Sequence, residues 1–306
     1  MKMLVVGAGS VGGFFGGQLA AKDRDVTFLV RDHRARQLER RLTIYSQERA
    51  TTIPIKVIAT GQKAGPFDVI LLAVKAYQLA VALDDLAPYV GGDTMILPVL
   101  NGMSHIEVLR SRLGAARVIG GVAILATSLD EKGWIQDQGG IHYLAFGEWD
   151  GARSERLLAL KSLLDGAGFE SKLSGDIERE MWEKWAMLAG LGAVTCLLDG
   201  NIGEVARASG KGVASDLFEE ITATIAASWK PLTTTYKAQT LALLTNESSQ
   251  QTSSMFRDLR ADHRIEADQI IGDLIVRAGA CRVATPLLEA ARVRLKVYEN
   301  RLSQRP

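Results

Sequence analysis

The first half of the chain contains short, continuous apolar runs separated by segments with helical spacing. The runs lie at residues 3–6, 26–30, 67–74 and 94–100, and helices are predicted at residues 13–22 and 79–86. Continuous rather than alternating apolar runs are typical of parallel strands that are buried on both faces. The pattern therefore predicts an α/β fold that begins with a Rossmann domain, in which strands and crossover helices alternate.

The pattern changes near residue 175. Before that point, strands are predicted at residues 118–128, 141–146 and 169–173, with a helix at residues 154–167 capped by Ser154. We expect the strands to complete the first sheet, with antiparallel additions. After residue 175, helical spacing dominates and strand patterns are scarce. We therefore predict two domains, a Rossmann domain at residues 1–175 and an all-α domain at residues 176–306.

Five helices are predicted in the second domain, at residues 176–198, 213–229, 236–244, 265–277 and 286–301. The first carries Trp182 and Trp185 on an apolar face, and we assign both indoles to packing rather than to chemistry. Thr285 and Pro286 are typical of the start of a helix, and they predict the beginning of the last one.

Composition and charge exclude several classes of partner. The chain has 306 residues and a formal net charge of +1, so it lacks the positive field that attracts nucleic acid or an anionic membrane. No apolar run of about 18 residues predicts a membrane span, and glycines interrupt the apolar N-terminus, which argues against a signal peptide. Cys196 and Cys281 have neither disulfide nor metal-ligand spacing, and the four histidines are scattered. We expect a cytoplasmic protein without a metal site.

Gly7-Ala8-Gly9-Ser10-Val11-Gly12 matches the G-x-G-x-x-G pattern of dinucleotide-binding proteins. Alone, the motif is weak evidence. Here it lies between a predicted strand and a predicted helix, and a second strand follows at βαβ spacing, which favours a dinucleotide site over a structural glycine turn. Gly7 would permit the turn, Gly9 the approach of a pyrophosphate, and Gly12 close packing of the helix. The N–H groups at the helix N-terminus, including those of Ser10 and Val11, would face the phosphates.

The residue after the second strand helps to select the cofactor. An acidic residue there binds the ribose hydroxyls of NAD, but this chain has Arg31, with Arg34 and Arg36 close behind. A guanidinium suits the additional 2′-phosphate of NADP. Asp32 competes with this interpretation, although a solvated loop charge also explains it. The pattern favours NADP.

Three polar residues follow the later strands. Lys75 and Gln78 come after the third apolar run, at the edge of the sheet where ligands bind in open α/β folds, and a surface lysine is an equally good interpretation of Lys75. Asn101 and Gly102 follow the fourth run. Alone, Asn-Gly favours a hairpin turn, whereas after a buried parallel strand it favours a loop that presents the Asn101 amide to nicotinamide or substrate.

Taken in order, several motifs resemble those of the ketopantoate reductase (2-dehydropantoate 2-reductase) family. They are GAGSVGG with Arg31, VKAYQ, LNGM, WEKW, SSMFRD, the following Glu266, and the TP near the end. The resemblance covers nearly the whole chain. It implies a Rossmann domain, a helical domain, and NADPH-dependent reduction of a 2-keto acid to a 2-hydroxy acid. We also expect a homodimer formed through the helical domain.

The resemblance also implies roles for individual residues. Lys184 would be the general acid that protonates the carbonyl oxygen, which suits a partly desolvated lysine, and Glu266 would bind or orient Lys184 and the substrate. Asn101 would hold nicotinamide and substrate in register, and Ser254 would bind the substrate. The simpler alternatives are helix capping for Ser254 and an exposed helix charge for Glu266.

The helix that carries Lys184 departs from the family pattern. The family usually has asparagines four and eight residues after its lysine, where this chain has Leu188 and Gly192. Loss of polar partners changes discrimination between substrates, so we expect a more apolar or differently shaped 2-keto acid than ketopantoate. Two alternatives stay open. One is a true 2-dehydropantoate 2-reductase of pantothenate biosynthesis, and the other is a non-catalytic dinucleotide-binding sensor or scaffold.

Overall fold

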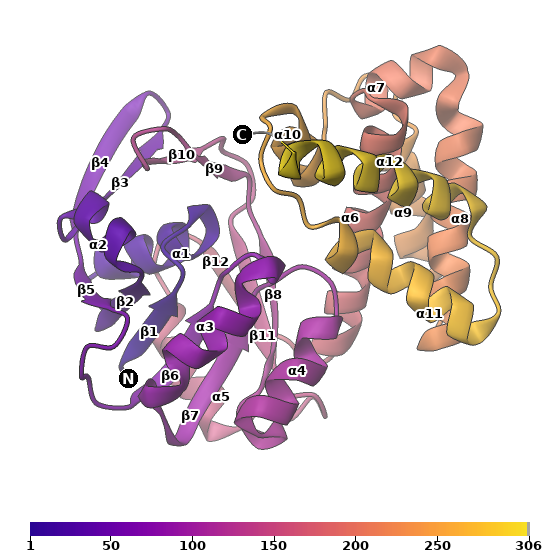
Figure 1. The fold of residues 1–306 in the computed structure, drawn as a ribbon. Helices are drawn as coiled ribbons and strands as arrows, with labels where there is room; N and C mark the ends of the chain where they lie inside the picture. Colours follow the sequence, from indigo (N-terminus) through magenta and orange to yellow (C-terminus); the bar gives the residue numbers. More distant parts are fainter. Residues whose placement is uncertain (305–306) are drawn as a thin grey trace. The chain divides into compact units, whose positions relative to one another are not determined.

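The computed structural model describes residues 1–304 and confirms the α/β architecture, with an N-terminal Rossmann-type sheet and a C-terminal helical region (Figure 1). The contacts within the chain define two compact units. The first contains residues 1–100 and 105–181, and the second contains residues 101–104 and the residues from 182 onward. Each unit buries apolar side chains of its own.

Five parallel strands form the main sheet, in the order β5-β2-β1-β6-β7. They are β1 (Met3–Val6), β2 (Val26–Val30), β5 (Lys56–Ala59), β6 (Phe67–Leu72) and β7 (Val90–Pro98). Val6 is in register with both Leu29 and Leu72, so the carboxyl ends of the three central strands are level. Pro98 is the last residue of the edge strand β7, a position that proline tolerates.

The helices of the first unit are α1 (Ser10–Ala20), α2 (Asp32–Leu38), α3 (Leu79–Leu86), α4 (Ser104–Leu113, from its second residue) and α5 (Glu155–Leu164), with short 3₁₀ turns at Ala76–Gln78, Ala87–Tyr89 and Ala115–Arg117. Helix α1 begins three residues earlier than predicted, and α4 was not predicted. Glycines allow α1 to pack closely on two sides. A Cβ atom on Gly16 would lie 2.6 Å from the Phe28 ring in the main sheet, and one on Gly13 would lie 2.6 Å from Ile135 in a second sheet.

The remaining strands form two further sheets. One has the order β4-β3-β10-β9 and the other β12-β11-β8. Their strands are β3 (Arg41–Ser46), β4 (Arg49–Pro54), β8 (Gly120–Ile124), β9 (Thr127–Leu129), β10 (Ile135–Asp137), β11 (Tyr143–Gly147) and β12 (Glu170–Leu173). The expectation that the later strands complete the main sheet was therefore wrong. Within residues 1–304, strand pairing between β7 and the chain before β8 is limited to an isolated bridge, Ile96 to Val118, and Pro98 has no N–H group with which to extend the ladder.

The described part of the second unit is helical. Its helices are α6 (Ile177–Leu198, from Trp182), α7 (Ile202–Val205), α8 (Lys211–Ser228), α9 (Thr234–Leu244), α10 (Ser254–Arg260), α11 (Asp273–Cys281) and α12 (Pro286–Ser303). A kinked turn, Ala206–Gly210, precedes α8, which lies against α9, α11 and α12. The helix predicted at residues 265–277 is confirmed from residue 268 onward, but it is not α-helical throughout. Its first turn, Asp268–Gly272, is π-helical and leads directly into α11.

The two tryptophans of α6 are buried, which confirms their assignment to packing. Trp182 stacks on Trp229 with ring centroids 5.3 Å apart, and the Trp185 indole nitrogen donates a hydrogen bond of 2.9 Å to the carbonyl oxygen of Ile270. These contacts fix one face of α6 inside the helical unit.

Two predicted helix caps have the right position but not the expected bonds. Ser154 precedes α5, yet its hydroxyl donates to Glu148. Thr285 precedes α12, but the Glu220 carboxylate of α8 accepts the N–H groups of Leu287 and Leu288, both at 2.9 Å. A carboxylate from a neighbouring helix therefore caps α12.

Within residues 1–304, no single helix is both long and apolar enough to cross a membrane. Helix α6 and the segment Ile202–Ser228 meet that criterion only together, as a pair bent by 62°.

Candidate functional site

The glycine loop after β1 has the geometry of a phosphate cradle. Gly7 has φ +98°, and a Cβ atom there would lie 2.9 Å from the carbonyl oxygen of Ala73. A Cβ atom on Gly12 would lie 2.2 Å from the carbonyl oxygen of Gly7, so the fold itself requires both glycines. Around Gly9, in contrast, no atom of the rest of the described chain lies within 4 Å of the Cβ position. The open backbone of Gly9 fits the approach of a pyrophosphate.

The start of α1 supplies unpaired backbone donors beside this loop. Gly9 is the N-cap and contributes no side-chain cap, and the first helical bond runs from Gly13 N–H to Gly9 C=O. The N–H groups of Ser10, Val11 and Gly12 therefore precede the helical hydrogen-bond ladder. Free donors and the positive end of the helix dipole favour an anion here, so these residues fit a dinucleotide.

The structure separates two arginines that the sequence groups together. Arg34 donates from Nε and Nη2 to the carbonyl oxygen of Ala8, at 3.2 and 3.0 Å, and from Nη2 to that of Gly133 at 3.0 Å. Burial lowers the pKa of Arg34. Arg31 follows β2, is exposed, and forms no hydrogen bond or ion pair with residues 1–304. Arg34 thus holds the glycine loop, whereas Arg31 is available to an external anion.

Lys75 and Gln78 follow β6 at the same edge of the sheet. Register places Leu72, at the end of β6, opposite Val6, which immediately precedes the glycine loop. Both side chains are half-buried, and the Gln78 carboxamide oxygen accepts the Lys75 N–H at 3.4 Å. Gln78 therefore shapes the turn in which Lys75 lies.

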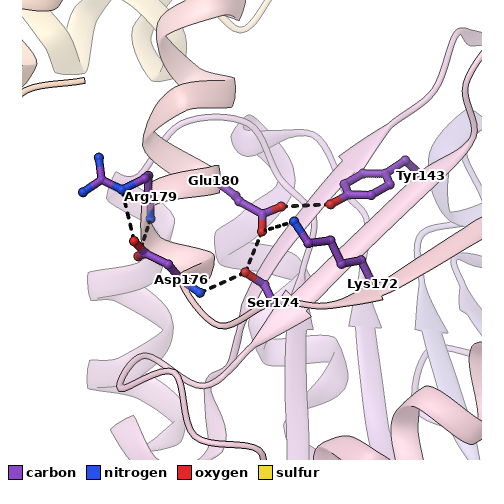
Figure 2. Close-up of polar contacts among 6 residues, drawn as sticks. All are labelled: Tyr143, Lys172, Ser174, Asp176, Arg179 and Glu180. Carbon is purple, nitrogen blue, oxygen red and sulfur yellow. Dashed lines mark hydrogen bonds and ion pairs between the residues drawn. The ribbon is translucent and has the colours of Figure 1, made fainter. Parts of the chain in front are cut away.

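The first turn of α6 is tied to the sheet of the first unit through Glu180 (Figure 2). Its Oε2 accepts the Tyr143 hydroxyl at 2.9 Å, and its Oε1 accepts Lys172 Nζ at 2.9 Å and the Ser174 hydroxyl at 2.6 Å. Burial, and then the Glu180 carboxylate, raise the pKa of Tyr143 to about 12. The unbroken helix continues from this anchor to Lys184, one turn later.

Lys184 is half-buried and has a carboxylate neighbour. Desolvation lowers the pKa of its ammonium group to about 8, and the charge of Glu266 acts in the opposite direction. Glu266 is only 6% exposed, so it is not the exposed helix charge of the simpler interpretation. A lysine with this pKa can both hold and release a proton near neutral pH.

Leu188 and Gly192 lie on the same face of α6 as Lys184, because residues four apart on a helix lie above one another. Gly192 is buried, and the terminal methyl carbon of Met255 lies 2.7 Å from the position of a Cβ atom on it. An apolar side chain therefore covers Gly192. Leu188 is half-buried.

The serine that caps α10 is Ser253, not Ser254. The Ser253 hydroxyl accepts the N–H of Phe256 at 2.9 Å and shares a 2.9 Å hydrogen bond with Thr195 of α6. Ser254 is half-buried, and its hydroxyl has no partner among the residues that the structure describes. The capping alternative for Ser254 is therefore wrong, and its hydroxyl is available to a ligand.

Asn101 belongs to a loop between β7 and α4, so the hairpin alternative is also wrong. By its contacts the loop Asn101–Ser104 belongs to the helical unit, which also contains Lys184 and Glu266. The Asn101 carbonyl oxygen accepts a hydrogen bond from Gln269 at 3.2 Å, while its side-chain amide is unpaired within residues 1–304.

The sequence did not predict the roles of several residues that shape these sites. They are Arg34, which hydrogen-bonds to the glycine loop, and Glu180, Ser253, Met255 and Gln269. The SSMFRD segment did contain a signal for Ser253, since the first of two serines before a helix can serve as its cap. The others act through contacts between distant parts of the chain, for which spacing along the sequence gives no signal.

Two models of one protein family match the chain. Residues 3–151 match the family described as ketopantoate reductase PanE/ApbA, and residues 176–299 match its C-terminal domain. The uncharacterized oxidoreductase YkpB of Bacillus subtilis is 36% identical over 301 residues, which cover 98% of this chain and 99% of that protein.

Solved structures share the fold over nearly the whole chain. The crystal structure of 2-dehydropantoate 2-reductase from Geobacter metallireducens has a TM-score of 0.86 at 24% identity, and the match covers 97% of this chain and 99% of that one. A D-mandelate dehydrogenase with NADH and anilino(oxo)acetate has a TM-score of 0.88 at 19% identity, over 99% and 100% of the two chains.

Proposed function

The chain is an oxidoreductase of the ketopantoate reductase family, and we propose that it reduces a 2-keto acid to the 2-hydroxy acid with NADPH. The observation that carries this proposal is the environment of Lys184. Burial lowers the pKa of its ammonium group to about 8, beside the buried Glu266 carboxylate. A general acid works best when its pKa lies close to the operating pH.

In the proposed reaction, bound NADPH supplies the hydride that the carbonyl carbon receives. Lys184 donates its proton to the carbonyl oxygen, so negative charge does not build up there. Glu266 favours the protonated form of Lys184 because it raises the pKa of the ammonium group. We assign the unpaired side chains of Asn101 and Ser254 to the orientation of the nicotinamide and the keto acid.

We assign the cofactor to the glycine loop, with the pyrophosphate beside Gly9 and the N–H groups of Ser10, Val11 and Gly12, in the turn that Gly7 permits. The unpaired guanidinium of Arg31 would bind the 2′-phosphate, which favours NADP over NAD. Lys75 and Gln78 would border the same site from the end of β6.

We propose that the substrate carries an apolar side chain. Leu188 and Gly192 take the places of two family asparagines, and Met255 covers Gly192 with a methyl group. A pocket wall without amide groups gives a hydroxylated substrate no hydrogen-bond partner. Ketopantoate, which carries a hydroxyl group, would therefore lose its advantage over a purely apolar 2-keto acid.

Oxidation of NADPH across a panel of 2-keto acids tests this assignment. The panel contains ketopantoate, branched aliphatic 2-keto acids and phenylglyoxylate, the last because a protein of the same fold is a D-mandelate dehydrogenase. We expect an apolar acid to have the highest kcat/KM. Preference for ketopantoate by orders of magnitude would instead identify a 2-dehydropantoate 2-reductase.

Replacement of Lys184 by alanine separates an enzyme from a dinucleotide sensor. We expect the Lys184→Ala protein to bind NADPH normally and to lose reduction by a factor of about 10² to 10⁴, the usual contribution of a general acid. Unchanged turnover would remove Lys184 as the acid. The absence of turnover by the unaltered protein on the whole panel, with NADPH still bound, would favour the sensor.

We also propose a homodimer formed through the helical unit. Val276 on α11 and Val293 and Val297 on α12 are 71%, 63% and 42% exposed, and Val293 and Val297 share a face of α12 because they are four residues apart. Light scattering on the protein and on a Val293→Glu variant tests this, and a monomer at micromolar concentration would overturn it.

A further inference from the structure

One side chain, Gln269, holds both ends of the loop that contains Asn101. Its Nε2 donates to the Asn101 carbonyl oxygen at 3.2 Å, and its Oε1 accepts the Ser104 hydroxyl at 3.0 Å. Because a backbone carbonyl can only accept, the amide group must have this orientation. The Gln269 side chain therefore bridges the first and last residues of Asn101–Ser104.

The backbone of the loop also lies directly against Gln269. Gly102 has φ +82°, and a Cβ atom there would lie 2.8 Å from the carbonyl oxygen of Gln269. Only glycine accommodates both this conformation and this approach. The loop is thus fixed by two hydrogen bonds and by close packing on one residue.

Gln269 lies in the π-helical turn Asp268–Gly272, and this turn is tied to the proposed acid and its carboxylate. The N–H of Ile270 donates to the carbonyl oxygen of Glu266 at 3.0 Å, and the carbonyl oxygen of Ile270 accepts the Trp185 indole at 2.9 Å. Trp185 is the neighbour of Lys184 in α6. Single π-helical turns occur frequently at functional sites.

We propose that Gln269 is a positioning residue that fixes the backbone of Asn101, so that the unpaired Asn101 amide is presented to the nicotinamide and the keto acid. This inference rests on the proposed function. The π-helical turn then contacts Asn101 through Gln269, Glu266 through the Ile270 N–H, and the neighbour of Lys184, Trp185, through the Ile270 carbonyl oxygen. It would thereby fix the relative positions of the three proposed functional residues. A small displacement of such a group costs a large factor in rate, on the order of 10² for about 1 Å.

Steady-state kinetics on Gln269→Ala, Gln269→Glu and Ser104→Ala test this role. Gln269→Ala removes both hydrogen bonds, and we expect kcat/KM for the keto acid to fall about 10- to 100-fold, while the Kd of NADPH changes by less than about threefold. Gln269→Glu should be at least as impaired, because its carboxylate faces the Asn101 carbonyl oxygen. Ser104→Ala removes one bond and should lose about three- to tenfold. Gln239→Ala, an exposed glutamine of α9, is the matched control.

A double-mutant cycle with Asn101→Ala distinguishes positioning from general support of the fold. If Gln269 acts through the Asn101 side chain, Gln269→Ala should cost less than about threefold in the Asn101→Ala background. Additive losses, or an unchanged kcat/KM in Gln269→Ala, would overturn the proposal. If Gln269→Ala does not fold, the same cycle with Ser104→Ala decides in the same way.

The Lys184→Ala protein keeps the two hypotheses apart. Loss of turnover in Lys184→Ala without an effect of Gln269 would leave the proposed function intact and reject the role of Gln269. Unchanged turnover in Lys184→Ala would reject the proposed acid, whatever Gln269 does.

Discussion

The Glu266 carboxylate acts on Lys184 inside the helical unit: desolvation lowers the pKa of the lysine to about 8, and the charge of the carboxylate opposes that shift. Replacement of Glu266 by glutamine removes the opposing charge, so the pKa of Lys184 should fall further. Because reduction needs the protonated lysine, the basic limb of the kcat/KM profile should move to lower pH, by on the order of one unit.

The pH dependence of kcat/KM between pH 5 and pH 10 measures this shift. Glu178→Gln is the control, because it removes a carboxylate from the first turn of α6 without altering a described contact. A basic limb that stays in place in Glu266→Gln would contradict the assignment of Lys184 as the titrating acid.

The desolvated charge of Lys184 should also cost stability. Its folded-state pKa of about 8 lies below the usual lysine pKa of 10.5, so the unfolded chain binds more protons between these two values. Stability should therefore rise with pH through this window, and the cost of the desolvated charge is complete below about pH 8. We expect the free energy of unfolding of the unaltered protein to rise by about 1–3 kcal/mol between pH 8 and pH 10 relative to Lys184→Met, which has no ammonium group to titrate.

Lys172 provides a matched comparison with the opposite sign. Its hydrogen bond to Glu180 raises its pKa, so it stabilises the fold below its unfolded pKa and loses that effect as pH rises through the folded value. The side chain is 48% exposed, and solvent screens the pair, so Lys172→Met should destabilise by less than about 1 kcal/mol. Urea unfolding at pH 7, 8 and 10 measures both variants. An equal change of stability between pH 8 and pH 10 in the unaltered protein and in Lys184→Met would refute the stability argument.

Two glycines of the loop should differ in their roles, because Gly12 is required for folding and Gly9 for cofactor binding. The Cβ position on Gly12 lies 2.2 Å from a backbone oxygen, so Gly12→Ala should destabilise the protein by about 1–3 kcal/mol or more. The Cβ position on Gly9 meets no atom within 4 Å, and its φ of −81° suits alanine. We expect Gly9→Ala to keep the Tm and to weaken NADPH binding about tenfold or more, because the methyl group stands in the path of the pyrophosphate.

Thermal unfolding and fluorescence titration with NADPH measure the two effects. Gly212→Ala is the control, because Gly212 lies in α8, has open space at its Cβ position and does not have a positive φ. Gly61→Ala would be unsuitable, because Gly61 has a φ of +84° that alanine rarely adopts. Normal NADPH affinity in Gly9→Ala would indicate that the dinucleotide does not approach this loop.

The sequence is sufficient to predict the βαβ unit because its signals are local. The apolar runs at residues 3–6 and 26–30 coincide with β1 and β2, and the glycine motif lies between them as expected. Sheet membership of the later strands could not be predicted. It depends on where β8 meets β7, where Gly121 and Pro98 approach so closely that a Cβ atom on Gly121 would lie 2.3 Å from the proline oxygen.

At the candidate site, too, features that depend on local spacing could be predicted, whereas those that depend on tertiary contacts could not. The spacing from Lys184 to Leu188 and Gly192 follows from helix geometry, so their common face could be predicted. That Met255 covers Gly192, or that Gln269 holds Asn101 from 168 residues away, depends on tertiary contacts. The sequence also shows Arg31, Arg34 and Arg36 as one basic group, although within residues 1–304 Arg34 alone of the three donates hydrogen bonds to the glycine loop.

These three arginines should respond differently to replacement by alanine. Arg31→Ala should weaken NADPH binding about tenfold or more and leave NADH almost unchanged, since only NADPH carries the 2′-phosphate. Arg34→Ala removes the bonds to the Ala8 carbonyl oxygen and should weaken both cofactors and lower the Tm. Arg36→Ala, exposed on α2, is the control. Equal loss for NADPH and NADH in Arg31→Ala would be incompatible with a 2′-phosphate contact.

The hydrogen bonds that Glu180 accepts at the start of α6 should contribute to the stability of the protein. Glu180→Ala leaves the Ser174 hydroxyl, which is buried, and the half-buried Tyr143 hydroxyl without the carboxylate that accepts them (Figure 2). Loss of an acceptor from buried donors costs about 1–3 kcal/mol, so the free energy of unfolding should fall by that amount. Glu178→Ala removes a first-turn carboxylate of the same helix without these contacts and should cost less than about 0.5 kcal/mol. Guanidinium unfolding of both variants measures the difference, and equal losses would mean that the helix dipole, rather than the hydrogen bonds to the sheet, accounts for the effect of Glu180.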